Sequence, residues 1–266
     1  MRLHLVLSRA TTPLVVASFP ALLLCSACGG APPQVSVVPG LSVVAPAVRA
    51  ADTVVFRRVL TRDGRDSTAG TRTVVTRVVK GADGARLLEV EQRFPGGGGQ
   101  IVDTALADPG TLRAVAHRSH QPRRTMRFAF VGDTAEGVVS AVGPDGGPPS
   151  PPEAVHQGLG GPLFDSNLLD LVVAALPLRS QFTAELPFFI YERGGRVAMP
   201  VTVRERTRVT FPLLGEREVW VVTVGVPGAP ATFWVDTTAR AVLQVRYEIA
   251  AAAVKFTDER MTPLPS

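Results

Sequence analysis

The stretch Val242-Leu243-Gln244-Val245-Arg246-Tyr247-Glu248-Ile249 alternates between apolar and polar side chains along its whole length. Successive side chains of a β-strand point to opposite faces of the sheet. The residues expected to share the apolar face are Leu243, Val245, Tyr247 and Ile249. This pattern predicts a half-buried antiparallel strand.

The same period of two recurs through most of the chain. It is present in residues 71–79, 85–94, 126–131, 196–211 and 216–226. Short combinations of Gly, Pro and Asp, such as Arg62-Asp63-Gly64, separate the runs, as they do in hairpins. We therefore expect about twelve antiparallel strands between Thr53 and Asp258. No repeat of fixed length is visible, which argues against a propeller.

One segment breaks the strand pattern and predicts a helix over about residues 166–176. It begins at Asp165, Ser166 and Asn167, whose side chains can cap a helix by accepting hydrogen bonds from its first free N–H groups. Pro177 comes directly after the apolar run and should end the helix. At roughly 16 Å the helix is too short to cross a membrane.

Leu168, Leu171 and Val172 have the spacing i, i+3 and i+4 that places side chains on one stripe of a helix. A helix with so much apolar surface must pack against the sheet. The predicted fold class is therefore mainly β. We expect a large curved antiparallel sheet or open barrel, with one apolar helix on its concave face.

Residues 1–27 have the layout of a secretory signal peptide. Arg2 and Arg9 lie in a first part without acidic residues, and an apolar run follows from Ala10 to Leu24. That run is too short for a normal membrane-spanning helix. We expect the segment to be removed on export, so it should not be part of the mature fold.

The segment Leu24-Cys25-Ser26-Ala27-Cys28-Gly29 resembles the lipobox of bacterial lipoproteins. In that family a small residue precedes a cysteine that receives a diacylglyceryl group, and here Ala27 and Cys28 match those positions. Cys25 departs from the leucine that is usual three residues before the lipidated cysteine. The resemblance implies a lipid anchor on Cys28 and, with Gly29 next, an outer-membrane lipoprotein facing the periplasm. Cleavage without lipidation is the alternative.

Residues 28–51 lack clear periodicity and contain four prolines, which favours an extended tether. The β domain is then expected over residues 52–260, followed by a short tail at 261–266. Cys25 and Cys28 are the two cysteines of the chain. We therefore expect no disulfide and no thiolate metal site in the domain.

The net charge of +5 does not indicate nucleic-acid binding. Arginines are scattered among acidic residues, as in Arg204-Glu205-Arg206, whereas nucleic-acid-binding proteins usually gather Lys and Arg on one face. The densest basic spot, Arg123-Arg124 with Arg127, is predicted to be a solvated hairpin end. We expect no nucleic-acid partner.

No combination of residues predicts catalysis, a metal or a cofactor. His117 and His120 would face opposite sides of a strand, and we expect both to be surface imidazoles. Glu89 and Glu91 would share one face at a spacing that glycosidases use, but such pairs are common on exposed strands. Ser166 lacks a nucleophile elbow. The sequence therefore predicts a protein that is not an enzyme.

The segment Thr232–Arg240 is a strand with an Asp turn that leads into the alternating stretch Leu243–Tyr247. Together with the export signal, the sheet and the helix, this pattern resembles the LolA/LolB-like superfamily over roughly residues 52–260. Those periplasmic and outer-membrane proteins form an open β-barrel that carries lipid or lipoprotein acyl chains. The resemblance implies a lipid ligand and supplies no catalytic residues.

The residues expected to bind the ligand are Leu168, Leu171, Val172, Trp220 and Trp234. The expected function is that of a membrane-anchored lipoprotein that binds a lipid or another apolar ligand. A structural or accessory envelope lipoprotein with a filled core stays open as an alternative, and so does an unrecognised hydrolase. An apolar cavity between sheet and helix would favour ligand binding.

Overall fold

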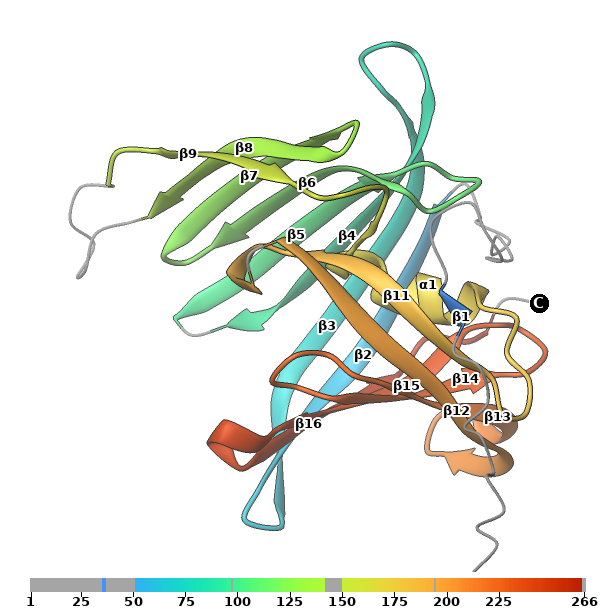
Figure 1. The fold of residues 1–266 in the computed structure, drawn as a ribbon. Coiled ribbons are helices and arrows are strands. Elements are labelled where there is room, and N and C mark those ends of the chain that lie inside the picture. The colour runs from blue at the N-terminus through green and yellow to red at the C-terminus, as the bar shows by residue number, and fades with distance from the viewer. Residues whose placement is uncertain (1–34, 37–50, 97, 142–149, 194, 265–266) are drawn as a thin grey trace, which may run out of the picture. The chain divides into compact units, whose positions relative to one another are not determined.

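Residues 35–36, 51–96, 98–141, 150–193 and 195–264 are described by the structure, a computed structural model (Figure 1). The predicted signal peptide, Cys28 and most of the predicted tether lie outside these residues. The strands are β1 (Val35–Ser36), β2 (Ala51–Arg62), β3 (Arg65–Lys80), β4 (Arg86–Gly96), β5 (Gly99–Ala107), β6 (Ala114–Gln121), β7 (Arg124–Val131), β8 (Thr134–Ala141), β9 (Glu153–Gly158), β10 (Phe164–Asp165), β11 (Thr183–Ile190), β12 (Gly195–Phe211), β13 (Gly215–Val224), β14 (Ala231–Asp236), β15 (Val242–Ile249) and β16 (Val254–Arg260). The helical segments are the 3₁₀ helices η2 (Ser166–Leu168), η3 (Tyr191–Arg193) and η4 (Ala250–Ala252), and the α-helix α1 (Leu169–Ala175).

The described strands form one 16-stranded sheet in the order β1-β11-β12-β13-β14-β15-β16-β2-β3-β4-β5-β6-β7-β8-β9, with β10 also paired to β11. Two runs of antiparallel hairpins, β2–β9 and β11–β16, meet where β16 pairs with β2. Among the described strands β9 pairs only with β8, so the sheet is curved but not closed. The predicted curved antiparallel sheet is confirmed, whereas the expected number of strands was too low.

Two of the additional strands are too short to show a sequence pattern. β1 and β10 have two residues each and pair in parallel with β11. β1 lies inside the segment expected to be a tether, so that part of the chain joins the sheet. A period of two cannot be recognised in two residues, and parallel partners leave no hairpin turn to detect.

The turn between β2 and β3 is one that the sequence predicts. Asp63 and Gly64 have φ angles of 51° and 71°. A two-residue hairpin loop with positive φ at both positions matches the twist of the flanking strands, and Asp-Gly favours it. The turn places Arg62 opposite Arg65.

The predicted helix is present as η2 followed by α1. The side chain of Asp165 accepts a hydrogen bond from the backbone N–H of Asn167. Of the three candidate capping residues, Asp165 is therefore the one that caps the helix. Leu176 already has an extended backbone, and Pro177 follows it. Among the described helices, none is long and apolar enough to cross a membrane.

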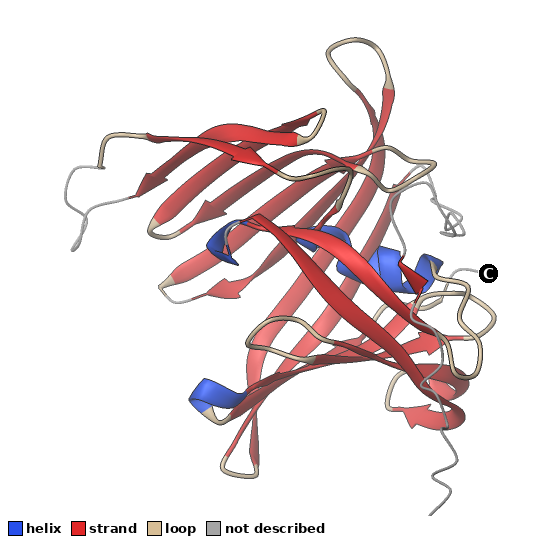
Figure 2. Ribbon diagram, in the orientation of Figure 1, coloured by secondary structure: helices blue, strands red, loops and turns tan. Residues whose placement is uncertain are grey.

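The helix lies in the hollow of the curved sheet (Figure 2). Leu168 and Val172 are fully buried in the main hydrophobic core, and Leu171 packs against it with part of its surface exposed. The predicted apolar stripe is thus confirmed. The other large core residues include Phe164, Phe188, Phe233, Leu88 and Met199.

The alternating sequence predicts that Leu243 shares the inner, apolar face with Val245, but a bulge places it on the outer face. Trp234 lies opposite Gln244, but Val235 lies opposite Val242, so the register shifts by one residue. An extra residue in one strand turns the side chains beyond it to the other face. Leu243 therefore joins a small cluster on the outer face, whereas Val245 stays in the main core.

Candidate functional site

The five residues expected to bind a ligand do not line one apolar space. Leu168, Leu171 and Val172 contact the main core directly. Trp220 lies opposite Val235 and packs against the core that contains the helix, whereas Trp234 packs with the outer cluster. The two tryptophans are adjacent in the register but face opposite sides of the sheet. The expectation that they share a cavity wall was wrong.

Apolar side chains do remain uncovered elsewhere on the concave face. Leu60 lies opposite Phe256, and Phe94 lies opposite Ile101. The Cζ atom of Arg58 is 4.9 Å from the ring centre of Phe94 and 5.9 Å from that of Phe256, which brings the two pairs together. We call these four apolar residues the concave patch. All are partly exposed, and none belongs to a hydrophobic cluster of the described residues.

A chain of buried ion pairs lies beside the concave patch. Arg58 binds Asp258 through two hydrogen bonds of 2.7 and 2.8 Å. Asp258 is also 2.9 Å from Nε of Arg72, which in turn donates to Asp170 of α1 at 2.7 Å. These four charges form the inner ionic network, with two arginines matched by two carboxylates. It ties three strands, β2, β3 and β16, to the helix.

The network and its surroundings shift two pKa values. Burial alone would lower the pKa of Arg72, but Asp170, Tyr247 and Asp258 together raise it above its ordinary value. Burial raises the pKa of Tyr247 above 10.0, and the negative charge of Asp170 adds to this effect, while Arg72 opposes it. Arg72 therefore stays charged and Tyr247 stays neutral at any physiological pH.

The raised pKa of Tyr247 predicts a loss of stability in alkali. Above about pH 10 an unfolded tyrosine ionises, whereas the folded one keeps its proton, so unfolding releases a proton there. The free energy of unfolding of the wild type minus that of Tyr247→Phe should therefore fall as the pH rises from about 10. Urea denaturation at a series of pH values measures this difference. A difference independent of pH would contradict the assignment.

Polar contacts also fix the helix at its two ends. Nε2 of Gln92 donates to the carbonyl oxygen of Asn167 at 2.7 Å, and Nη1 of Arg240 donates to that of Leu176 at 2.7 Å. Strand β4 and the turn between β14 and β15 therefore provide partners for carbonyl groups near the beginning and directly after the end of the helix. These bonds, with the Asp170 ion pair, hold the helix as a fixed part of the core.

The two histidines of the His-Arg-Ser-His segment face opposite sides, as the sequence predicts. His120 is exposed on the outer face, but His117 is buried, so the expected surface imidazole was wrong there. Nδ1 of His117 lies 2.9 Å from the fully buried Asp165. His117 lines a pocket of about 90 Å³ that Ser166 and Asn167 also line. Among the described residues no group of three His, Cys, Asp or Glu could hold a metal ion.

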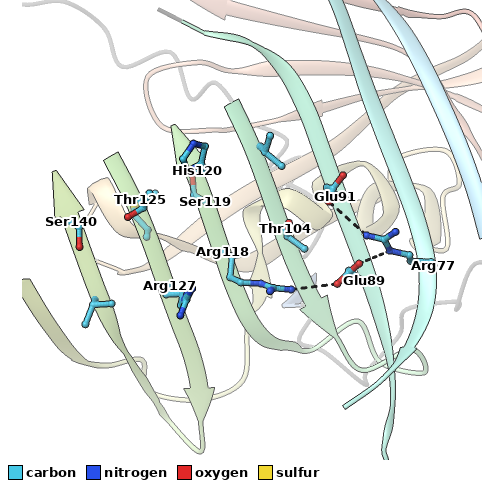
Figure 3. Close-up of a pocket in the computed structure, with 13 residues that line it drawn as sticks. Arg77, Glu89, Glu91, Thr104, Arg118, Ser119, His120, Thr125, Arg127 and Ser140 are labelled. Atoms are coloured by element: carbon cyan, nitrogen blue, oxygen red, sulfur yellow. Dashed lines mark hydrogen bonds and ion pairs between the residues drawn. The ribbon is translucent and has the colours of Figure 1, made fainter. Parts of the chain in front are cut away.

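The outer face of β3–β8 carries a larger hollow of about 660 Å³ (Figure 3). Its charged lining residues are Arg77, Glu89, Glu91, Arg118, His120 and Arg127. Glu89 accepts from Arg77 at 2.5 Å, and Glu91 lies 3.7 Å from the same arginine. Glu89 and Glu91 share one face as predicted, but ion pairs hold both of them, and neither is a freely exposed acid.

These features define a class of protein. It is an open, curved antiparallel sheet wrapped around one fixed helix, with an apolar patch on the concave face and a charged hollow on the outer face. The chain belongs to the family described as "Protein of unknown function (DUF3108)", whose model matches residues 59–257. The matched region runs from β2 to β16 and includes both candidate surfaces. No curated protein matches the chain.

Two solved structures resemble the chain loosely. One is a beta-barrel-like protein of the domain of unknown function DUF1849 from Brucella abortus, with 15% identity and a TM-score of 0.46. The likeness covers 87% of this chain and 99% of that one. The other is a DUF1329 family protein from Desulfovibrio piger, with 8% identity and a TM-score of 0.26 over 80% of this chain and 85% of that one. Both likenesses are too loose for comparison residue by residue.

Proposed function

We propose that this chain is an exported lipoprotein, anchored through Cys28 to the outer membrane and facing the periplasm, that binds an acyl chain or a similar apolar ligand. It catalyses no reaction in this proposal. The observation that carries the ligand is the concave patch, because its four apolar side chains stay partly exposed beside a packed core. Covering apolar surface gains about 25 cal/mol per Å². The resemblance to LolA/LolB-like proteins implies the same kind of ligand.

The anchor is tested by changing the cysteine. In Cys28→Ala the acyl group has no acceptor, so the protein should leave the membrane fraction or stay unprocessed. Two or more acyl chains hold a protein on a membrane far better than one, so the wild type should remain bound through washing with salt. Fractionation followed by mass spectrometry of the N-terminal residue measures both properties. A wild type that is soluble, with an unmodified N-terminus, would exclude the anchor.

The ligand is tested by calorimetric titration of Cys28→Ala protein with fatty acids of increasing length. Each added methylene contributes about 0.8 kcal/mol, so affinity should rise about fourfold per methylene until the patch is covered. Phe94→Ser should weaken binding about tenfold or more. Val131→Ser is the matched control, because Val131 is 62% exposed and lies outside the patch. Tryptophan fluorescence is not a suitable readout, since neither Trp220 nor Trp234 belongs to the patch.

A second function is favoured by the packing between helix and sheet. Leu168 and Val172 have no exposed surface, and the helix is fixed by side chains of β4 and of the turn between β14 and β15. A structural or accessory envelope lipoprotein with a filled core would have this interior. An affinity that does not change with chain length, or no binding at all, would favour this second function and overturn the first.

A further inference from the structure

Two arginines lie directly opposite each other in the outer hollow. Arg118 of β6 is the register partner of Arg127 of β7. Directly opposed side chains in an antiparallel pair have Cβ atoms about 5 Å apart, and like charges in this position destabilise the sheet. The surrounding carboxylates therefore decide whether the two positive charges are neutralised within the protein.

The carboxylates of the hollow are mostly engaged by other arginines. Glu89 and Glu91 bind Arg77, and Glu91 also lies 2.6 Å from Arg93. Arg118 reaches Glu89 through a single contact of 3.5 Å, which leaves most of its five N–H donors available. Arg127 is exposed, and within the described residues no carboxylate lies in ion-pair distance of it. Figure 3 shows Arg118 of β6 extended toward Glu89, with Arg127 on the neighbouring strand β7.

The adjacent row of the sheet adds neutral hydrogen-bonding groups. Thr125 lies opposite His120 on one side and opposite Ser140 on the other. These three side chains line the hollow one pleat repeat, about 7 Å, along the strands from the arginine pair. The two rows together offer guanidinium, hydroxyl and imidazole groups to a ligand with several acceptor oxygens.

We propose that Arg118 and Arg127, supported by Thr125 and Ser140, bind the phosphate group of a phosphate ester in the outer hollow. Guanidinium groups match phosphate oxygens in charge and in planar geometry, and an anion between two opposed arginines removes their repulsion. A hollow of about 660 Å³ has room for the group that carries the phosphate as well. The site is on the opposite face of the sheet from the concave patch, so it does not depend on the apolar ligand.

The test compares two single arginine substitutions in the full-length Cys28→Ala protein, because a lipid anchor would bind every vesicle whatever residue stands at position 127. Arg127→Gln removes the arginine that has no ion-pair partner among the described residues. The control is Arg123→Gln, which makes the same charge change at the exposed turn of the same hairpin, outside the hollow. Inorganic phosphate and glycerol phosphate are titrated by calorimetry, and vesicles of phosphatidylglycerol are compared with uncharged detergent micelles by sedimentation. The melting temperature is recorded with and without phosphate.

Arg127→Gln should weaken phosphate binding about tenfold or more, as expected for the loss of a charged hydrogen-bonding group, while Arg123→Gln stays within about twofold of the wild type. Phosphate should raise the melting temperature of the wild type but not that of Arg127→Gln. Binding of the soluble phosphates would identify a soluble ester, and Arg127-dependent binding of vesicles alone would identify a lipid headgroup. Equal weakening by the two substitutions, or no binding to any phosphate probe, would overturn the proposal.

Discussion

Val172→Asp should lower the free energy of unfolding by about 4 kcal/mol or more, which is most of the stability of an ordinary domain. Val172 has no exposed surface and lies on the face of α1 that contacts the main core. A carboxylate there would lose its water without gaining a partner, or would have to take up a proton. Urea denaturation monitored by circular dichroism measures the loss.

The matched control is Val131→Asp, which introduces the same group at the end of β7. Because Val131 is 62% exposed, the free energy of unfolding of Val131→Asp should differ from that of the wild type by no more than about 0.5 kcal/mol. The free energy of unfolding of Leu171→Asp should lie between those of the two other variants, since Leu171 is only partly buried. If Val172→Asp were as stable as Val131→Asp, the helix would not be part of the core.

Local sequence was sufficient for the elements that carry their own signal. The strands β7 and β15 alternate in the sequence, Asp63-Gly64 sets a hairpin, and Pro177 ends the helix. Each of these features depends on neighbouring residues alone. The bulge at Leu243 was not predictable in this way, because it is a relation between β14 and β15. Likewise, the pairing of β16 with β2 joins residues about 200 positions apart.

The two candidate surfaces show a similar division. Trp220 and Trp234 could be assigned to strands but not to one face, because the register of β13 and β14 sets them on opposite sides. The inner ionic network does have a signal in the sequence. Arg72 shares the parity of Val74 in β3, and Asp258 shares that of Phe256 in β16, so each is a charged residue at an inward position. A charged residue at such a position needs a partner, and the fold supplies it from a distant strand.

The aromatic residues illustrate why ligand sites are harder to read than cores. Phe233 and Phe94 are both aromatic residues of predicted strands, yet Phe233 is fully buried in the main core and Phe94 is partly exposed. What separates them is whether the helix, which comes from elsewhere in the chain, covers that part of the concave face.

Asp258→Asn should destabilise the protein by about 3 kcal/mol or more. Asp258 is fully buried and is the carboxylate shared by Arg58 and Arg72. Removing one member of a buried ion pair leaves its partner as an uncompensated charge, which typically costs 3–5 kcal/mol. Arg72 keeps Asp170, but among the described residues Arg58 has no other ion-pair partner. The expected loss therefore comes mainly from Arg58.

The neighbouring residue provides the control for this effect. Glu259 pairs with Arg57 on the exposed side of the same two strands, and Glu259→Gln should cost less than about 1 kcal/mol because water screens that pair. A double variant isolates the cause. Arg58→Met added to Asp258→Asn removes the uncompensated charge, so the double variant should be more stable than Asp258→Asn alone. If it is less stable, the loss arises from packing around Asp258, and the network does not hold β2 and β16 together through charge.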